Sequence, residues 1–226
     1  MSALGAIFDL DGTLVDTCAL HERAWANLAH SLALPMSRAF FLEHFGRRNE
    51  PIIMALHERA GRSVPPAARI HELAERKEEE FRAMLAANFP AMPGSHALLR
   101  ALRDTGWRLA VGSSAPPTNV DAHLRGLGCP ELFETVVTGA CVTRGKPDPD
   151  VFLLAAERLR IQPSRCIVIE DAVPGIEAAH RAGMVCVALC SQGHTHAELA
   201  SADLIVDSLG ELSAARLAAL LPSAHA

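Results

Sequence analysis

Two long stretches of the chain differ in how their apolar positions repeat. Between residues 16 and 87, apolar side chains recur every three or four positions, which is the spacing of one helix face. The pattern predicts a linker and helix over 16–34, a short helix over 40–44, a helix starting at Pro51 and a long helix over 66–87. From Pro93 onward, short apolar runs alternate with helical periodicity. The chain therefore joins a helical segment to one of alternating helices and strands.

The alternating segment predicts a parallel sheet. Strands are expected over 6–8, 107–112, 135–138, 166–169, 185–189 and 204–206, the last at an edge. Helices are expected over 95–105, 120–127, 151–159 and 176–182, with a short fraying helix from Ala214. Continuous apolar strands separated by helices are typical of a parallel sheet covered on both faces. We therefore expect an α/β, Rossmann-like core formed by residues 1–15 and 88–226, with an inserted helical domain at 16–87.

The long helix over 66–87 carries both apolar and acidic residues. Its apolar positions are expected to face inward: Ile70, Leu73, Phe81 and Leu85. Its acidic positions are expected to face solvent: Glu75, Glu78, Glu79 and Glu80. An acidic run of this kind is more often a solvated helix face than a binding site.

Polar residues follow several predicted strands. In chain order they are Asp9 and Asp11, Ser113 and Ser114, Lys146 in a loop, and Glu170 and Asp171. Ligands of parallel sheets bind beyond the carboxyl ends of the strands, so these residues are expected to form one site. Carboxylates this close repel one another unless a cation shares the site or one of them holds a proton. Taken singly, Asp11-Gly12 is as typical of a plain turn as of a catalytic motif. A serine after a strand, such as Ser113, is commonly only a helix cap.

The run Asp9-Leu10-Asp11-Gly12-Thr13, followed in order by Ser113, Lys146 and Glu170-Asp171, resembles the four motifs of the haloacid dehalogenase (HAD) superfamily of phosphotransferases. The resemblance implies that Asp9 attacks phosphorus and forms an aspartyl-phosphate. It also implies that Asp11 donates a proton to the leaving oxygen and later takes one from water. Gly12 would allow the tight turn that follows the two aspartates.

The same resemblance implies a phosphate site and a Mg²⁺ site. Ser113, the backbone at Ser114, and Lys146 would hold the phosphoryl oxygens, with Lys146 also binding Asp9. Mg²⁺ would be bound by Asp9, Asp171 and the backbone carbonyl of Asp11, with Glu170 as a ligand or a support for the ligands. Two prolines stiffen the loop around Lys146, and Asp148 is expected to cap a helix that begins at Pro149.

The helical insert resembles a HAD cap that closes over the site and selects the substrate. Its candidate residues are Asp16, Thr17, His21, Trp25, Arg47, Arg48, Asn49 and Lys77. The run from Asp16 to Trp25 is similar to β-phosphoglucomutases and related sugar phosphatases, in which the histidine matching His21 helps to position the general acid/base. Packing is the alternative role for Trp25, and a plain helix-face position is the alternative for His21.

Two departures from the mutase sequence pattern favour hydrolysis of the phosphate ester over a mutase reaction. The mutases present a Ser-Lys pair where this chain has Ala115-Pro116, and the cap arginine position holds Asn49. A mutase must grip a second phosphate, which requires cations at both places. We therefore expect a phosphatase, with a phosphosugar mutase as the alternative. A dehalogenase would not need Asp11, a phosphonatase would rest on Lys77 alone, and a non-catalytic sugar-phosphate sensor would not need the full acidic set.

Composition narrows the possible partners. The 226 residues are 50% apolar and carry a formal charge of −5, so nucleic acid is not an expected partner. No apolar run has membrane-spanning length, and no secretory signal pattern opens the chain. The expected partner is a small phosphorylated metabolite, bound by a monomer in the cytoplasm.

The cysteines and a histidine pair could suggest further chemistry. Six cysteines are scattered without paired spacing, which predicts neither disulfides nor a zinc site but reduced thiols. Cys18, close to the aspartate pair, is expected to pack as a small apolar residue. His194-Thr195-His196 could suggest a metal site, but a solvent-facing loop is the preferred interpretation.

Overall fold

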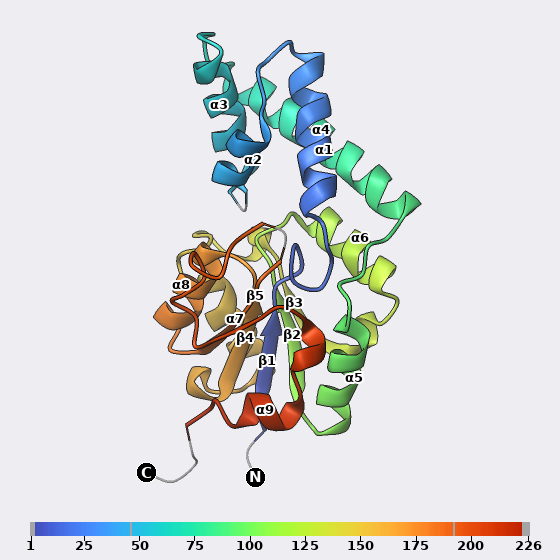
Figure 1. The fold of residues 1–226 in the computed structure, drawn as a ribbon, viewed down its shortest axis with the longest axis vertical. Helices are drawn as coiled ribbons and strands as arrows, with labels where there is room; N and C mark the ends of the chain where they lie inside the picture. Colours follow the sequence, from blue (N-terminus) through green and yellow to red (C-terminus); the bar gives the residue numbers. More distant parts are fainter. Residues whose placement is uncertain (1–2, 46, 192, 223–226) are drawn as a thin grey trace. The chain divides into compact units, whose positions relative to one another are not determined.

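The structure, a computed structural model, describes residues 3–45, 47–191 and 193–222. The chain divides into two compact units (Figure 1): a core unit, Met1–Asp16 with Pro90–Ala226, and a helical unit, Thr17–Phe89. The expected insert, 16–87, differs from the helical unit by one residue at its start and two at its end. The helical unit thus interrupts the core just after the first strand.

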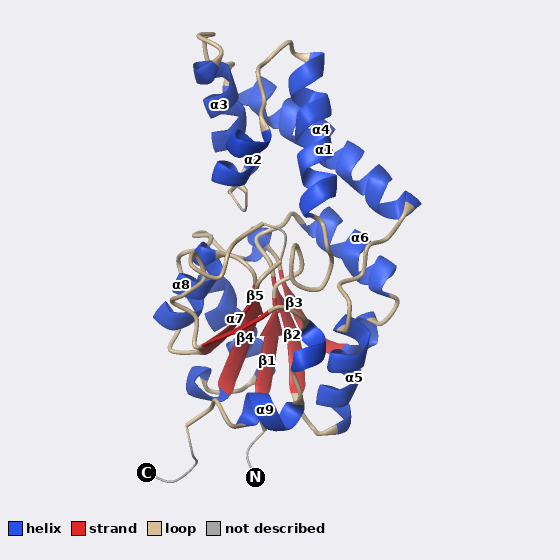
Figure 2. Ribbon diagram, viewed as in Figure 1, coloured by secondary structure: helices blue, strands red, loops and turns tan. Residues whose placement is uncertain are grey.

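The core unit is built on a parallel sheet, drawn in red in Figure 2. Its strands are β1 (Gly5–Phe8), β2 (Arg108–Gly112), β3 (Phe133–Val137), β4 (Cys166–Glu170), β5 (Val185–Leu189) and β6 (Leu204–Val206). Their order is β3-β2-β1-β4-β5-β6, and every neighbouring pair is parallel. Phe8 at the end of β1 lies opposite Val111 and Ile169. The α/β fold class is therefore confirmed, and the residues that follow these central strands leave the sheet at one edge.

Helices cover both faces of this sheet (Figure 2). They are α5 (Ser95–Asp104), α6 (Pro117–Leu127), α7 (Asp150–Leu159), α8 (Val173–Arg181) and α9 (Ala214–Ala218), with 3₁₀ turns at Pro130–Leu132, Gly139–Cys141, Pro163–Arg165 and Leu209–Glu211. On one face, Phe152 and Ala155 of α7 and Ile176 of α8 pack against Ile7 and Val168 of the sheet. All five side chains are fully buried, so burial of apolar surface stabilises the packing of α7 and α8 on the central strands.

The helical unit forms a small core of its own. Its helices are α1 (Cys18–Ser31), α2 (Arg38–His44), α3 (Asn49–Arg59) and α4 (Ala67–Ala87). Trp25, Leu28, Phe41, Leu56 and Leu73 are buried together between them, as is Cys18. Ser37 begins α2 by accepting a hydrogen bond from the Phe40 amide. None of the helices in the described ranges is long and apolar enough to cross a membrane.

Candidate active site

Asp9, Lys146 and Glu170 form the centre of the site. Asp9 directly follows β1, and its amide donates to the Ile169 carbonyl of β4 at 3.0 Å. The Lys146 ammonium donates to Asp9 Oδ1 at 2.6 Å and to Glu170 Oε1 at 2.7 Å. Nζ also lies 4.9 Å from the centre of the Phe152 ring. Residues 137 positions apart in the chain are thus joined in one charge-assisted network.

Hydrogen bonds from nearby backbone amides and from Ser191 orient the carboxylates of Glu170 and Asp171. Glu170 Oε2 accepts hydrogen bonds from the amides of Asp171 and Ala172, each at 2.7 Å. Gly175 makes room for this carboxylate, because a Cβ there would lie 2.0 Å from Glu170 Cδ. Asp171 Oδ2 accepts from the Ser191 hydroxyl at 2.9 Å. Ser191, which the sequence analysis did not single out, therefore orients one of the candidate metal ligands.

Burial and mutual repulsion raise the pKa values of two of these carboxylates. Asp9, Glu170 and Asp171 are at most 6% exposed. Burial, and then the charges of Glu170 and Asp11, raise the pKa of Asp9 to about 7, against the opposing charge of Lys146. Burial and the charges of Glu170 and Asp9 raise the pKa of Asp171 well above its usual value. Burial acts to lower the pKa of Lys146, but the charges of Asp9 and Glu170 outweigh it and raise that pKa.

A tight turn places Asp11 beside this cluster. The Gly12 amide donates to the Val15 carbonyl at 2.8 Å, and Gly12 has a φ of +77°, which favours glycine. A Cβ at Gly12 would lie 1.9 Å from Asp171 Oδ2, so the turn also needs glycine for space. The backbone after Asp11 therefore runs directly against the Asp171 carboxylate.

The structure adds His123, which sequence reasoning missed. His123 of α6 is fully buried, and its Nε2 lies 3.1 Å from Asp11 Oδ1. Its Nδ1 lies 2.6 Å from the Asn119 carbonyl oxygen. Burial acts to lower the pKa of His123, but the charge of Asp11 and their hydrogen bond outweigh it and raise that pKa. With acceptors at both ring nitrogens, the imidazole donates from both when Asp11 is ionised.

The candidate phosphate residues follow β2. Ser113 is buried; its amide donates to the Val137 carbonyl at 3.0 Å, and its Oγ accepts from the Ala115 amide at 3.1 Å. Ser114 is exposed. Gly139 allows close approach to this loop, since a Cβ there would lie 2.4 Å from the Ser114 carbonyl oxygen. The Ser113 hydroxyl thus accepts a hydrogen bond within its own loop, but it does not cap α6, whose N-cap residue is Pro116 and has no side-chain cap.

The loop of Lys146 differs from prediction in one respect. Helix α7 begins at Asp150 after Pro149, and no side chain caps it, so the expected cap by Asp148 is wrong. Arg144 instead pairs with Asp148 at 3.2 Å and with Asp150 at 2.8 Å. Because α7 begins at Asp150, Pro149 and not Asp148 occupies the N-cap position, and the Asp148 carboxylate pairs with the Arg144 guanidinium instead.

The candidate substrate residues of the helical unit fall into a buried and an exposed group. Lys77 is 1% exposed; its Nζ lies 2.7 Å from His21 Nδ1 and 2.9 Å from Glu78 Oε1. Asn49 also donates to Glu78 Oε1, at 2.8 Å. The expected outward position of Glu78 is therefore wrong: the carboxylate is buried because Lys77 neutralises it. Trp25 is buried beneath Lys77, with Nζ 5.2 Å from its ring centre.

The other predicted residues of the insert lie elsewhere. Arg47 and Arg48 are exposed at the start of α3. Thr17 is fully buried before α1, and Asp16 lines a pocket of the core unit. The structure therefore joins Lys77 to His21 directly and to Asn49 through Glu78, and leaves the two arginines outside that group.

Comparison with known proteins identifies a family to which the geometry of this acidic site is suited. The sequence profile described as haloacid dehalogenase-like hydrolase matches residues 4–183. The chain belongs to this family. As a member of the haloacid dehalogenase-like hydrolases it is an enzyme, and its parallel sheet carries the acidic strand ends on which the resemblance rested.

Individual relatives narrow the comparison. The chain is 35% identical to hexitol phosphatase A of Escherichia coli K12 over 218 residues, 94% of either chain. It is 35% identical over 212 residues, 93% of this chain, to the chloroplastic 5-amino-6-(5-phospho-D-ribitylamino)uracil phosphatase of Arabidopsis thaliana, and spans 56% of that protein's length. The solved structure of β-phosphoglucomutase from Clostridium difficile is similar, with a TM-score of 0.87, 26% identity and 97% of each chain covered.

Proposed function

We propose that this hydrolase is a Mg²⁺-dependent phosphatase of sugar and sugar-alcohol phosphates that works through an aspartyl-phosphate. The observation that carries the proposal is the buried Asp9–Lys146–Glu170 network beside Asp11 and Asp171. Phosphate monoesters hydrolyse extremely slowly without a catalyst, so a nucleophile, charge neutralisation and a proton donor are all needed. This network contains a residue for each task. The phosphatases among the relatives support the substrate class.

Each residue has a task set by its position. Asp9, bound by Lys146, attacks phosphorus and splits one difficult displacement into two easier ones. Asp11 protonates the departing alkoxide and then takes a proton from the water that hydrolyses the phosphoenzyme. Lys146 offsets the charge of the phosphoryl oxygens beside Asp9, and the Ser113 hydroxyl and the backbone amide at Ser114, which follow β2, donate to those oxygens. The helical unit is proposed to select the substrate, through residues such as His21, Arg47 and Arg48.

The acidic groups fit a divalent cation. Among the described residues, three buried carboxylates, Asp9, Glu170 and Asp171, face the buried ammonium of Lys146, which leaves excess negative charge. Their oxygens are the ligands that Mg²⁺ prefers, and the Gly12 turn lies close enough to Asp171 to add a backbone carbonyl. Asp9, Asp171 and the Asp11 carbonyl would hold the ion. When bound, Mg²⁺ offsets the repulsion between the Asp9 carboxylate and an anionic phosphate.

Metal binding should stabilise the protein more as pH rises. The folded pKa of Asp9, about 7, is raised above the unfolded value of 3.8, so the metal-free folded state holds an extra proton between them. Metal-free stability therefore falls as pH rises through that window. Mg²⁺ binds the ionised carboxylates, so we expect its addition to raise Tm more at about pH 8 than at about pH 5. Thermal unfolding in EDTA and in Mg²⁺ measures both effects.

Matched variants of two aspartates make this test specific. Asp171→Asn should lose the gain in Tm, whereas Asp148→Asn, at an exposed ion pair, should keep it. An equal Mg²⁺ effect at both pH values, or a full effect in the Asp171 variant, would contradict the proposed metal ligands.

We assign His123 as a positioning residue for Asp11. Its Nε2 lies 3.1 Å from Oδ1 of the Asp11 carboxylate, a contact that orients this carboxylate for proton transfer. Burial of His123 and its second contact, to the Asn119 carbonyl, fix the plane of the ring. A carboxylate held in one orientation transfers protons more efficiently than one that rotates.

Replacing His123 should lower kcat with little change in KM. We expect His123→Leu to reduce kcat by about 10-fold or more on alkyl phosphates, because outer-shell hydrogen bonds typically contribute about 10- to 100-fold. His123→Gln, whose amide can still donate to Asp11, should recover most of this loss. p-Nitrophenyl phosphate, whose leaving group needs no proton, should show a smaller loss in its first step. Equal losses on both substrates and no recovery by glutamine would indicate a structural role alone.

A phosphosugar mutase is the alternative, which the similarity to β-phosphoglucomutase supports. A screen of phosphorylated metabolites in Mg²⁺ separates the two. It includes hexitol phosphates, hexose phosphates and β-glucose 1-phosphate, with inorganic phosphate and glucose 6-phosphate both measured. Phosphate release supports the phosphatase. Glucose 6-phosphate without phosphate release would overturn it in favour of the mutase.

A further inference from the structure

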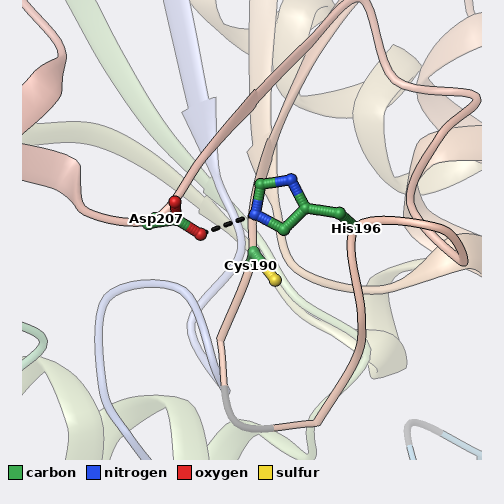
Figure 3. Close-up of side chains that lie close together, drawn as sticks. All are labelled: Cys190, His196 and Asp207. Atoms are coloured by element: carbon green, nitrogen blue, oxygen red, sulfur yellow. Dashed lines mark hydrogen bonds and ion pairs between the residues drawn. The ribbon is translucent and has the colours of Figure 1, made fainter.

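Three potential metal ligands from separate segments gather in the core unit outside the acidic network. Cys190 follows β5, Asp207 follows β6, and His196 lies in the loop between these strands. One ligand atom from each lies within 4.8 Å of the other two. Figure 3 shows the three side chains next to one another, with the hydrogen bond of 2.6 Å from His196 Nε2 to Asp207 Oδ1. The histidine pair in the sequence thus contributes one member, His196, to a mixed cluster.

The backbone fixes two of these residues side by side. The Cys190 amide donates to the Val206 carbonyl at 2.8 Å, which extends the β5–β6 pairing by one step. The amide of Asp207 donates to Glu211 Oε1 at 2.9 Å, and so does that of Ser208 at 3.0 Å. The thiol and the carboxylate are therefore presented by the ends of adjacent strands, which requires little ordering when a ligand binds.

The third residue is held by a short turn. The amide and hydroxyl of Thr195 donate to Glu198 Oε2 at 2.7 and 2.8 Å. Leu199, one residue further, is fully buried. This anchored turn holds the backbone next to His196, whose ring bonds to Asp207.

The cluster is accessible and electrically suited to a cation. The side chains of His196 and Asp207 are 56% and 73% exposed. Cys190 and Asp207 also line a pocket of about 290 Å³ beside Met92 and Pro93, which has room for an ion and its water. Burial, and the charges of Asp207 and Glu198, raise the pKa of the Cys190 thiol. A divalent cation would reverse that effect by replacing the thiol proton.

We propose that Cys190, His196 and Asp207 form a second metal site, which binds Zn²⁺ or another thiophilic divalent cation. A thiolate, an imidazole and a carboxylate are the donors that zinc accepts, and three protein ligands leave a fourth position for water. Mg²⁺ prefers oxygen ligands, so it is a poor competitor here. The acidic network at Asp9 and Asp171 offers only oxygens. The two sites therefore differ in the ions they select.

Cobalt titration of the Mg²⁺-saturated protein tests the site. Co²⁺ takes the same ligands as Zn²⁺, and its bond to a thiolate produces a charge-transfer absorption band in the near ultraviolet. We expect the wild-type protein to show this band with one equivalent of Co²⁺, and Zn²⁺ to abolish it. Cys190→Ser should lose the band. His196→Asn and Asp207→Asn should each weaken binding by about 10-fold or more.

Cys141→Ser is the matched control, because Cys141 is an exposed thiol outside the cluster. This variant should bind Co²⁺ as the wild type does, and circular dichroism checks that every variant is folded. Three results would overturn the proposal: no band in the wild type, a band that persists in Cys190→Ser, or binding that is unaffected by changes to His196 and Asp207. The last would indicate a lone thiol. None of these readouts depends on phosphatase activity.

Discussion

Asp9→Asn should abolish turnover while the protein stays folded. The amide has the shape of the carboxylate but is a very poor nucleophile, so no aspartyl-phosphate forms. We expect kcat to fall by more than about 10⁴-fold, as when other covalent nucleophiles are removed. Phosphate release from the best substrate of the metabolite screen measures the loss. Trapping of radiolabelled phosphate on acid-quenched protein should succeed for the wild type and fail for the variant.

Asp9→Asn should leave the stability of the fold unchanged or raise it slightly, whereas a packing defect would lower it. Asp9 adds to the crowding of Glu170 and Asp11, whose charges raise its pKa. Lys146 keeps its bond to Glu170 after the change. In EDTA at about pH 8 we therefore expect an unchanged or higher Tm. Asp148→Asn serves as the control with full activity. Substantial residual turnover, or phosphate still trapped on the Asp9→Asn variant, would exclude Asp9 as the nucleophile.

The sheet could be predicted from sequence because its signals are local. Most strands are short apolar runs that stop at, or directly before, a polar or glycine residue, such as Gly112 in β2, Glu170 in β4 and Asp9 after β1. The rule that parallel strands present ligands at their carboxyl ends then selected Asp9, Lys146 and Glu170, which the structure joins by hydrogen bonds. The order of these residues along the chain was enough to predict that they meet, because the central strands end side by side at one edge of the sheet.

Partners from distant segments could not be found in this way. His123 lies 112 positions from Asp11. Its one local signal is its place on the apolar face of α6, at helical spacing with Val120, Leu124 and Leu127, all buried. A polar residue in such a stripe needs a partner, but the sequence does not say which. The prediction for Glu78 was wrong for a different reason: its partner Lys77 is the neighbouring residue, but an acidic helix residue is expected in solvent unless a buried cation accompanies it.

The second large effect is expected for Asp11→Asn, and it should separate the two half-reactions. Asp11 is proposed to protonate the leaving alkoxide and then to activate water, so its loss should lower kcat on sugar phosphates by about 10²- to 10⁴-fold. p-Nitrophenyl phosphate bypasses the first requirement, since nitrophenolate leaves without a proton. With this substrate the variant should release a rapid burst of one nitrophenolate per site and then turn over slowly. The phosphoenzyme should accumulate, because its hydrolysis still lacks a base.

Rapid-quench measurement of phosphate bound to Asp9 decides this prediction. A phosphoenzyme that decays as fast as in the wild type would rule out Asp11 as the base, even if alkyl phosphates react slowly. Asp9 and the Gly12 turn both lie beside Asp171, so Mg²⁺ affinity must be measured in the same variant. If saturating Mg²⁺ restores neither half-reaction, the loss belongs to proton transfer. In the proposed mechanism the burst follows from these contacts: Asp9, bonded to Lys146, would attack phosphorus, and Asp11, bonded to His123, would transfer the protons.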